Sequence, residues 1–144
     1  MNPAVKLVTK SVVGTHKTIW RLTGGRIGSK LMGMRIMLLT TTGARSGKRR
    51  RVPLGYFYDS GDFVVCASNG GRRHNPDWYY NLTANPDAHV EINDADFEVI
   101  ADEATGDDRE RLWDILVSTN PGYRPYAERM KRRIPLIRLR PQQA

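Results

Sequence analysis

The segment from Thr40 to Leu54 combines residue types that bind anions in a loop and in the strand after it. Two glycines, Gly43 and Gly47, free the backbone to turn, and five cations fall within the seven positions from Arg45 to Arg51. Backbone N–H groups and guanidinium groups arranged in this way can bind the oxygens of a phosphate or carboxylate. The spacing is not that of a Walker loop. A hairpin with a solvated basic strand is the alternative interpretation, because charge runs usually face water.

A second segment, Cys66–Leu82, is predicted to contain a strand that ends in small residues, a Gly-Gly turn and a helix. The helix is expected to begin at Asn75-Pro76-Asp77, with Asn75 as its N-cap. Small residues let a flat ring approach the backbone closely, and a helix N-terminus beside them can take a negative charge. Taken one at a time, three residues of this segment have a structural rather than a functional interpretation. Trp78 is typical of a core residue, His74 of a solvated loop residue and Cys66 of an inert core thiol.

These segments carry the motifs of a known family. The strings are L-T-T-T-G-x-R-S-G-x-x-R-x-x-P-L from Leu39, A-S-x-G-G-x-x-x-N-P-x-W-Y-x-N-L from Ala67, and A-N-P from Ala84. In their order and spacing, from about Ile36 to Ile134, the chain resembles the deazaflavin-dependent nitroreductases, which use reduced coenzyme F-420. The resemblance implies a split β-barrel related to flavin-binding split barrels, with the deazaflavin in a groove on one face.

The resemblance also implies which residues bind the coenzyme. Those matched to its phosphate and oligoglutamate tail are Arg45, Ser46, Gly47 and Arg50. Those matched to the deazaflavin ring and ribityl chain are Pro53, Cys66, Ala67, Ser68 and Asn69, and further coenzyme-side positions are Arg72, Asn75, Trp78 and Asn81. Such a coenzyme is a flexible polyanion, and the strip Lys48–Arg51 offers cations on which to lay it. No metal site is expected, because the chain has a single cysteine and no cysteine/histidine cluster.

The candidate catalytic residues are Ser68, Tyr123 and Tyr126. Since a 5-deazaflavin is itself a hydride carrier, the protein must dock it, stack an electrophile on it and aim a hydrogen-bond donor at the oxygen that gains charge. The alternative is that both tyrosines only wall the pocket. Relative to the best-studied nitroreductases of the family, Gly55 and Asn120 each replace a tyrosine. We therefore expect hydride transfer to conjugated electrophiles such as quinones, enones, lactones or nitroaromatics, with bicyclic nitroimidazoles disfavoured.

The net charge of +8 is unevenly distributed along the chain. Residues 1–58 carry 12 Lys and Arg and no acid, residues 59–118 carry 14 acids against four Arg, and the remainder is basic again. This segregation predicts an anionic partner. Two alternatives to the deazaflavin reductase stay open at this point. One is a flavin mononucleotide-binding oxidoreductase on the same barrel, and the other is a basic nucleic-acid-binding module, although no nucleic-acid-binding motif is apparent.

The elements that must position these residues are mostly short strands. Strands are expected over Ile36–Thr42, Arg51–Tyr58, Phe63–Ala67, Ala88–Ile92, Phe97–Ala101 and Ile134–Leu139, with turns at residues 59–62 and 93–96. Helices are expected over Pro76–Ala84, after a capping box at Thr105–Asp108, and over Tyr123–Lys131. The pattern predicts an α+β, mainly β fold, a split β-barrel of mostly antiparallel strands with peripheral helices. It excludes a doubly wound sheet, because strands and helices do not alternate.

The 144 residues are expected to form one domain, with residues 1–33 an amphipathic basic helix and connection and residues 34–144 the split-barrel core. The helix, over Val5–Leu22, either packs on the barrel or lies on an anionic membrane. No apolar run approaches the roughly 18–20 residues that span a bilayer. No secretory signal is visible. We therefore expect a cytoplasmic monomer or weak oligomer, peripheral at the inner face of the cell membrane if the helix binds lipid.

Overall fold

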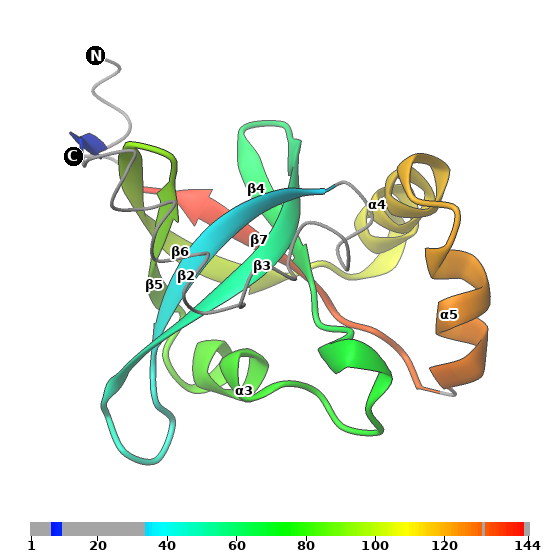
Figure 1. Cartoon of the computed structure of the whole chain (residues 1–144), viewed down its shortest axis with the longest axis horizontal. Helices are drawn as coiled ribbons and strands as arrows, with labels where there is room; N and C mark the ends of the chain where they lie inside the picture. The colour runs from blue at the N-terminus through cyan, green and yellow to red at the C-terminus, as the bar shows by residue number, and fades with distance from the viewer. Residues whose placement is uncertain (1–6, 10–33, 131, 143–144) are drawn as a thin grey trace.

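The structure is a computed structural model that describes residues 7–9, 34–130 and 132–142 (Figure 1). Six antiparallel strands form a barrel in the order β6-β5-β2-β3-β4-β7, and pairing of β6 with β7 closes it. These strands are β2 (Arg35–Thr42), β3 (Arg49–Asp59), β4 (Asp62–Cys66), β5 (Asp87–Ile92), β6 (Ala95–Glu103) and β7 (Leu136–Pro141). The predicted mainly β barrel is thus confirmed.

Both predicted hairpins form through two-residue turns. Ser60 and Gly61 connect β3 to β4 with φ angles of 53° and 86°, and Asn93 begins the β5–β6 turn with φ 54°. Turns of this kind match the twist of the flanking strands, and they favour Gly and Asn because the backbone is left-handed there. The turn residues therefore fix the register of both hairpins.

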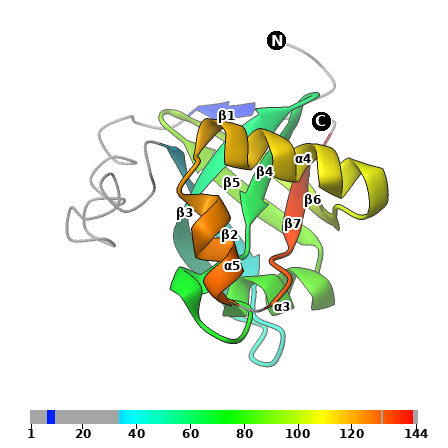
Figure 2. The same ribbon diagram turned by 90° about the vertical axis from the view of Figure 1, so that its right-hand side faces the viewer.

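Strand β4 is buried on both of its faces, which ties the barrel to its helices. Phe63 and Val65 point into the barrel core with Leu39 and Leu139, whereas Val64 packs in a second cluster with residues of α4 (Gly106–Thr119). Helices α4 and α5 (Tyr123–Met130) cover this side of the barrel, and α3 (Asp77–Ala84) lies at one end (Figure 2). None of the helices in the described ranges is long and apolar enough to cross a membrane.

The N-terminal segment departs from expectation where the structure describes it. Leu7–Thr9 form strand β1, which pairs with Ala95–Phe97 of β6. The predicted helix over Val5–Leu22 is therefore wrong at these three residues. The reason is that β7 pairs with β6 only from Val99 onward, which leaves the backbone of Ala95–Phe97 available to another strand. The rest of the predicted helix and connection lies outside the described residues.

Two predicted helix caps do not form, because distant arginines take the capping side chains. Asp108 of the expected capping box instead accepts Nε and Nη2 of Arg138 at 2.9 and 2.7 Å, and Thr105 makes no side-chain cap. The N-cap of α3 is Pro76 rather than Asn75, whose Oδ1 accepts a hydrogen bond from Arg132. In both places a bond to a charged partner replaces a local bond to the helix N-terminus.

Candidate functional site

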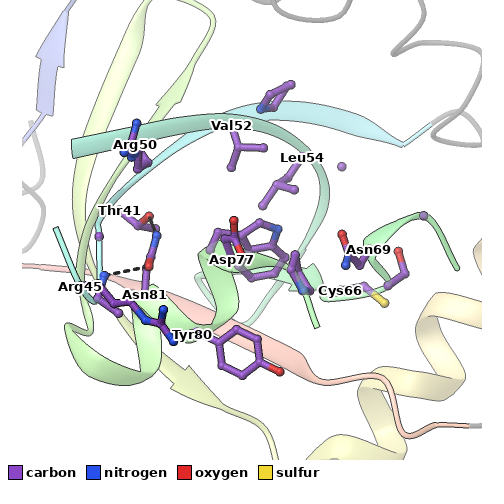
Figure 3. A pocket seen from close by; sticks show the side chains of 18 of the residues that line it. Thr41, Arg45, Arg50, Val52, Leu54, Cys66, Asn69, Asp77, Tyr80 and Asn81 are labelled. Atoms are coloured by element: carbon purple, nitrogen blue, oxygen red, sulfur yellow. Dashed lines mark hydrogen bonds between the residues drawn. The ribbon is translucent and has the colours of Figure 1, made fainter. Parts of the chain in front are cut away.

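A groove of about 1110 Å³ runs between the β2–β3 loop, strand β3, the segment after β4 and helix α3 (Figure 3). Ligand pockets typically have about 300–1,000 Å³, so the groove has room for a coenzyme. Predicted site residues that line it are Arg45, Ser46, Arg50, Pro53, Cys66, Ser68, Asn69, Trp78, Asn81 and Tyr123. Gly47, Lys48, Ala67, Arg72, Asn75 and Tyr126 are absent from its lining.

The cationic end of the groove is a tightly built loop. The Gly43 N–H donates to the Lys48 carbonyl at 2.8 Å, and the Ser46 hydroxyl accepts the Lys48 N–H at 3.1 Å. A Cβ on Gly43 would lie 2.6 Å from the Ser46 hydroxyl oxygen, so only glycine fits here without displacing that side chain. The loop thus holds Arg45 at the groove.

Asn81, predicted as a coenzyme contact, anchors this loop to helix α3. Its Oδ1 accepts the Ala44 N–H at 2.9 Å, and its Nδ2 donates to the Thr41 hydroxyl at 3.1 Å (Figure 3). The side chain is buried, and each of its polar groups has a protein partner. Asn81 therefore lines the groove while it positions the backbone around Arg45.

Strand geometry divides the cationic strip that the sequence suggested. Successive side chains of a strand point to opposite faces. Arg50 accordingly lines the groove, whereas Arg51 pairs with Glu91 at 3.6 Å and Arg49 donates to the Thr42 hydroxyl at 3.1 Å. Residues 48–51 therefore do not form a single strip along the groove. Arg50 is the one of these four that lines it, and Arg45 lines it as well.

The middle of the groove is lined mostly by apolar side chains, together with the Asp77 carboxylate (Figure 3). Val52 and Leu54, which follow Arg50 at every second position of β3, point into it (Figure 3), and Trp78 of α3 lines it as well. Trp78 is buried and belongs to the barrel core cluster as well. Neither Val52 nor Leu54 was predicted, although the alternation of β3 carries the signal that would have found them. This surface suits a flat, weakly polar ring system.

The far end of the groove is formed by Cys66, Ser68, Asn69 and Tyr123. Burial raises the pKa of the Tyr123 hydroxyl above its ordinary value, and the Ser68 side chain partly offsets this rise. Burial also raises the pKa of the Cys66 thiol to about 12, so the thiol stays protonated at neutral pH, as an inert residue would. The end therefore presents neutral hydrogen-bonding groups.

Tyr126 lies behind this end rather than in it. Its ring packs edge to face on Tyr123, with centroids 5.9 Å apart. Its hydroxyl is 3.3 Å from where a Cβ on Gly71 would sit. Tyr126 therefore packs against Tyr123 and the loop after β4, and its predicted contact with the substrate stays a prediction.

Comparison with known proteins agrees with this geometry. The family model described as F420H(2)-dependent quinone reductase matches residues 12–141. An F420H(2)-dependent quinone reductase of Mycobacterium tuberculosis is 38% identical over 126 residues, which cover 85% of this chain and 85% of that protein. The chain belongs to the F420H(2)-dependent quinone reductase family.

Solved structures support the family and its barrel. A structure described as an F420-H2 dependent reductase, FDR-A, has 39% identity and a TM-score of 0.65, covering 72% of this chain and 92% of its own. A second, described as a domain-swapped dimer, has 34% identity and a TM-score of 0.67, covering 88% and 96%. The resemblance to deazaflavin-dependent reductases is confirmed, with quinone reduction as the matching description.

Proposed function

We propose that this protein reduces quinones with reduced coenzyme F-420 as the electron donor, and that the groove holds the coenzyme. The observation that carries the proposal is the order of chemistry along the groove: two arginines at one end, a middle that is apolar apart from Asp77, and a neutral hydrogen-bonding end (Figure 3). In a deazaflavin coenzyme the phosphodiester and oligoglutamate tail suits the arginines, and the ring suits the surfaces beyond them. When bound, the reduced coenzyme supplies a hydride.

Each part of the groove has a separate task in this proposal. Arg45 and Arg50 bind the anionic tail, and guanidinium groups suit this task because they bind carboxylate and phosphate oxygens in pairs. Val52, Leu54 and Trp78 enclose the ring between apolar surfaces and exclude water. Fixed placement of both reactants is the main contribution that the protein makes to such a transfer.

The neutral end serves the quinone. A quinone that accepts a hydride gains negative charge on oxygen and takes up one proton to become a hydroquinone. Tyr123, which burial keeps protonated, donates a hydrogen bond to that oxygen, Ser68 at the same end is a second donor, and solvent is the final proton source. Gly55 lines the groove without a side chain, which leaves room for a ring.

Replacing Tyr123 by phenylalanine is expected to lower kcat about 10-fold or more, with little change in the Kd of the coenzyme. The change removes one hydrogen-bond donor and leaves the ring that packs on Tyr126. Steady-state rates with a soluble quinone such as menadione measure the effect. Tyr80→Phe is the matched control, since Tyr80 lines the groove and is about half exposed on α3. Equal rates for wild type and Tyr123→Phe would leave Tyr123 as a wall residue only.

The test of the proposed activity is oxidation of the electron donor in the presence of menadione. Turnover is expected with reduced coenzyme F-420 and not with NADPH, because no dinucleotide-binding fingerprint is present in the sequence. Absorbance of the donor follows the reaction, and a sample without protein corrects for direct chemical reduction. Equal turnover with NADPH, without added flavin or deazaflavin, contradicts the proposal.

We also propose that residues 1–33 bring the protein to anionic membranes, where lipid-soluble quinones partition. Residues 1–35 carry seven cations and no acid, and each cation near such a surface contributes about 1 kcal/mol. Co-sedimentation with anionic vesicles at low salt is expected, with release near 1 M salt, where the Debye length is about 3 Å. Neutral vesicles are the control. Failure to bind anionic vesicles at low salt would contradict this proposal.

The oligomeric state is a separate question. Sedimentation without lipid measures whether the protein is a monomer or a weak oligomer.

A further inference from the structure

Three predicted coenzyme-side residues that lie outside the groove share one partner. Arg132, between α5 and β7, donates Nη2 to the carbonyl oxygens of Ala67 and Ser68 at 3.1 and 3.0 Å and Nε to that of Arg72 at 3.0 Å. Its Nη1 donates to Oδ1 of Asn75. All four acceptors belong to the segment of residues 67–75, here called the ring-end loop. The planar fork of a guanidinium group can make these bonds at once.

The ring-end loop has a backbone that requires outside support. Asn69, Gly70 and Gly71 of the turn η1 (Asn69–Gly71) have consecutive positive φ angles of 54°, 63° and 86°. Gly70 and Gly71 adopt such angles at no steric cost, but their backbone freedom also means that the loop keeps this one conformation only where its surroundings hold it. Tyr126 contacts the loop at Gly71, and Arg132 holds it at four acceptors from residue 67 to residue 75.

The bonds to Arg132 also set the direction of the peptide groups at the groove. The C=O and N–H of a trans peptide point in opposite directions. Because the Ala67 and Ser68 carbonyls face Arg132, the N–H groups of Ser68 and Asn69 point away from it. The Ser68 N–H partly offsets the rise that burial causes in the pKa of the Cys66 thiol, which lines the groove. A cation on the carbonyl side polarises the peptide and strengthens its N–H as a donor.

We propose that Arg132 is a positioning residue of the coenzyme site, which fixes the ring-end loop so that Ser68 and Asn69 face the ring of the bound deazaflavin. The identity of the ligand in this inference rests on the proposed function. The role of Arg132 in holding the ring-end loop does not rest on it. Arg132 itself is absent from the groove lining, so it acts through the loop. The four bonds couple the segment after the C-terminal end of α5, a helix whose first residue is Tyr123, to the segment that carries Ser68.

The test compares Arg132→Gln and Arg132→Lys with Arg133→Gln. Arg133 is exposed and adjacent, so its variant loses the same charge without touching the ring-end loop. Amide hydrogen exchange of the coenzyme-free proteins is the first readout. Exchange at residues 69–73 should be faster in both Arg132 variants, with strand β4 unchanged, because lysine cannot reproduce the four-bond fork. Exchange equal to that of Arg133→Gln, or full recovery in Arg132→Lys, overturns the proposal.

The second readout uses coenzyme F-420 and menadione. Arg132→Gln should raise the Kd of the coenzyme about 10- to 100-fold and lower kcat, with KM for menadione at saturating coenzyme little changed. If Arg132→Gln does not fold, Asn75→Ala removes one of the four bonds and should give the same changes on a smaller scale. Coenzyme binding equal to that of Arg133→Gln overturns the proposal. If the wild type does not bind coenzyme F-420, the proposed function fails, while hydrogen exchange still tests the role of Arg132.

Discussion

Replacing Arg45 and Arg50 together by alanine is expected to raise the Kd of coenzyme F-420 about 100-fold or more. Both side chains line the cationic end of the groove, and loss of two hydrogen bonds between charged groups has an effect of this size. At saturating coenzyme, KM for the quinone should change little, because the two arginines lie at the opposite end from Tyr123. Equilibrium titration with the oxidised coenzyme measures the change.

The matched control for this double variant is Arg124→Ala with Arg129→Ala. Both residues are exposed on α5 and absent from the groove lining, so their loss removes two positive charges without touching the proposed site. If the polyanionic coenzyme were attracted only by the net charge of the protein, the two double variants would weaken binding equally. Equal Kd values would therefore remove Arg45 and Arg50 from the site.

Replacing Arg138 by methionine is expected to lower the free energy of unfolding by about 3–5 kcal/mol. The Arg138 side chain is only 6% exposed, and it pairs with Asp59 and Asp108 at 2.7 Å and with Asp62 at 3.2 Å. Methionine fills the space but leaves these carboxylates, two of them largely buried, without their central cation. Urea denaturation at pH 7 measures the loss. Arg140→Gln, whose side chain is about half exposed, should cost no more than about 1 kcal/mol.

The ion pairs around Arg138 also predict how the stability of the protein depends on pH. Hydrogen bonds from Arg111 and Arg138 hold the pKa of the Asp59 carboxyl below its ordinary value, and Arg138 does the same for Asp108. A carboxyl with a lowered pKa in the folded state stabilises the protein above the unfolded pKa near 3.9, and this contribution is lost as the pH falls further. The wild type should therefore lose more stability than Arg138→Met between pH 7 and pH 3. Parallel pH curves for the two proteins would contradict this.

Features that depend on neighbouring residues could be predicted from the sequence. The hairpin turns at Ser60-Gly61 and Asn93-Asp94, and the helices α3 and α5, follow from local conformational preference. The caps could not be predicted, since Asn75 and Asp108 meet arginines 57 and 30 residues away in sequence. Strand β1 could not be predicted either, because it depends on a stretch of β6 that β7 leaves unpaired.

The candidate site, like the fold, could be predicted from the sequence only in part. Motif resemblance identified the two groove ends, and alternation along β3 separates Arg50 from Arg51 once the strand is known. The role of Arg132 has no local signal, because its four acceptors lie 57 to 65 residues earlier in the chain. Ala67, Arg72 and Asn75 align with coenzyme-side positions of the family, yet they contact Arg132 and are absent from the groove lining. Only the folded chain distinguishes residues that line the groove from residues that hold it.

The central claim, that the groove binds a deazaflavin, is tested most directly by titrating intrinsic tryptophan fluorescence. Trp78 lines the groove, so a ring bound there should quench it. Coenzyme F-420 should quench the fluorescence saturably, and the quenching should be lost in Trp78→Phe. Flavin mononucleotide should not saturate over the same range, because its single phosphate does not use both Arg45 and Arg50 as the longer tail does. Absence of quenching by coenzyme F-420, or equal or tighter binding of flavin mononucleotide, would contradict the claim.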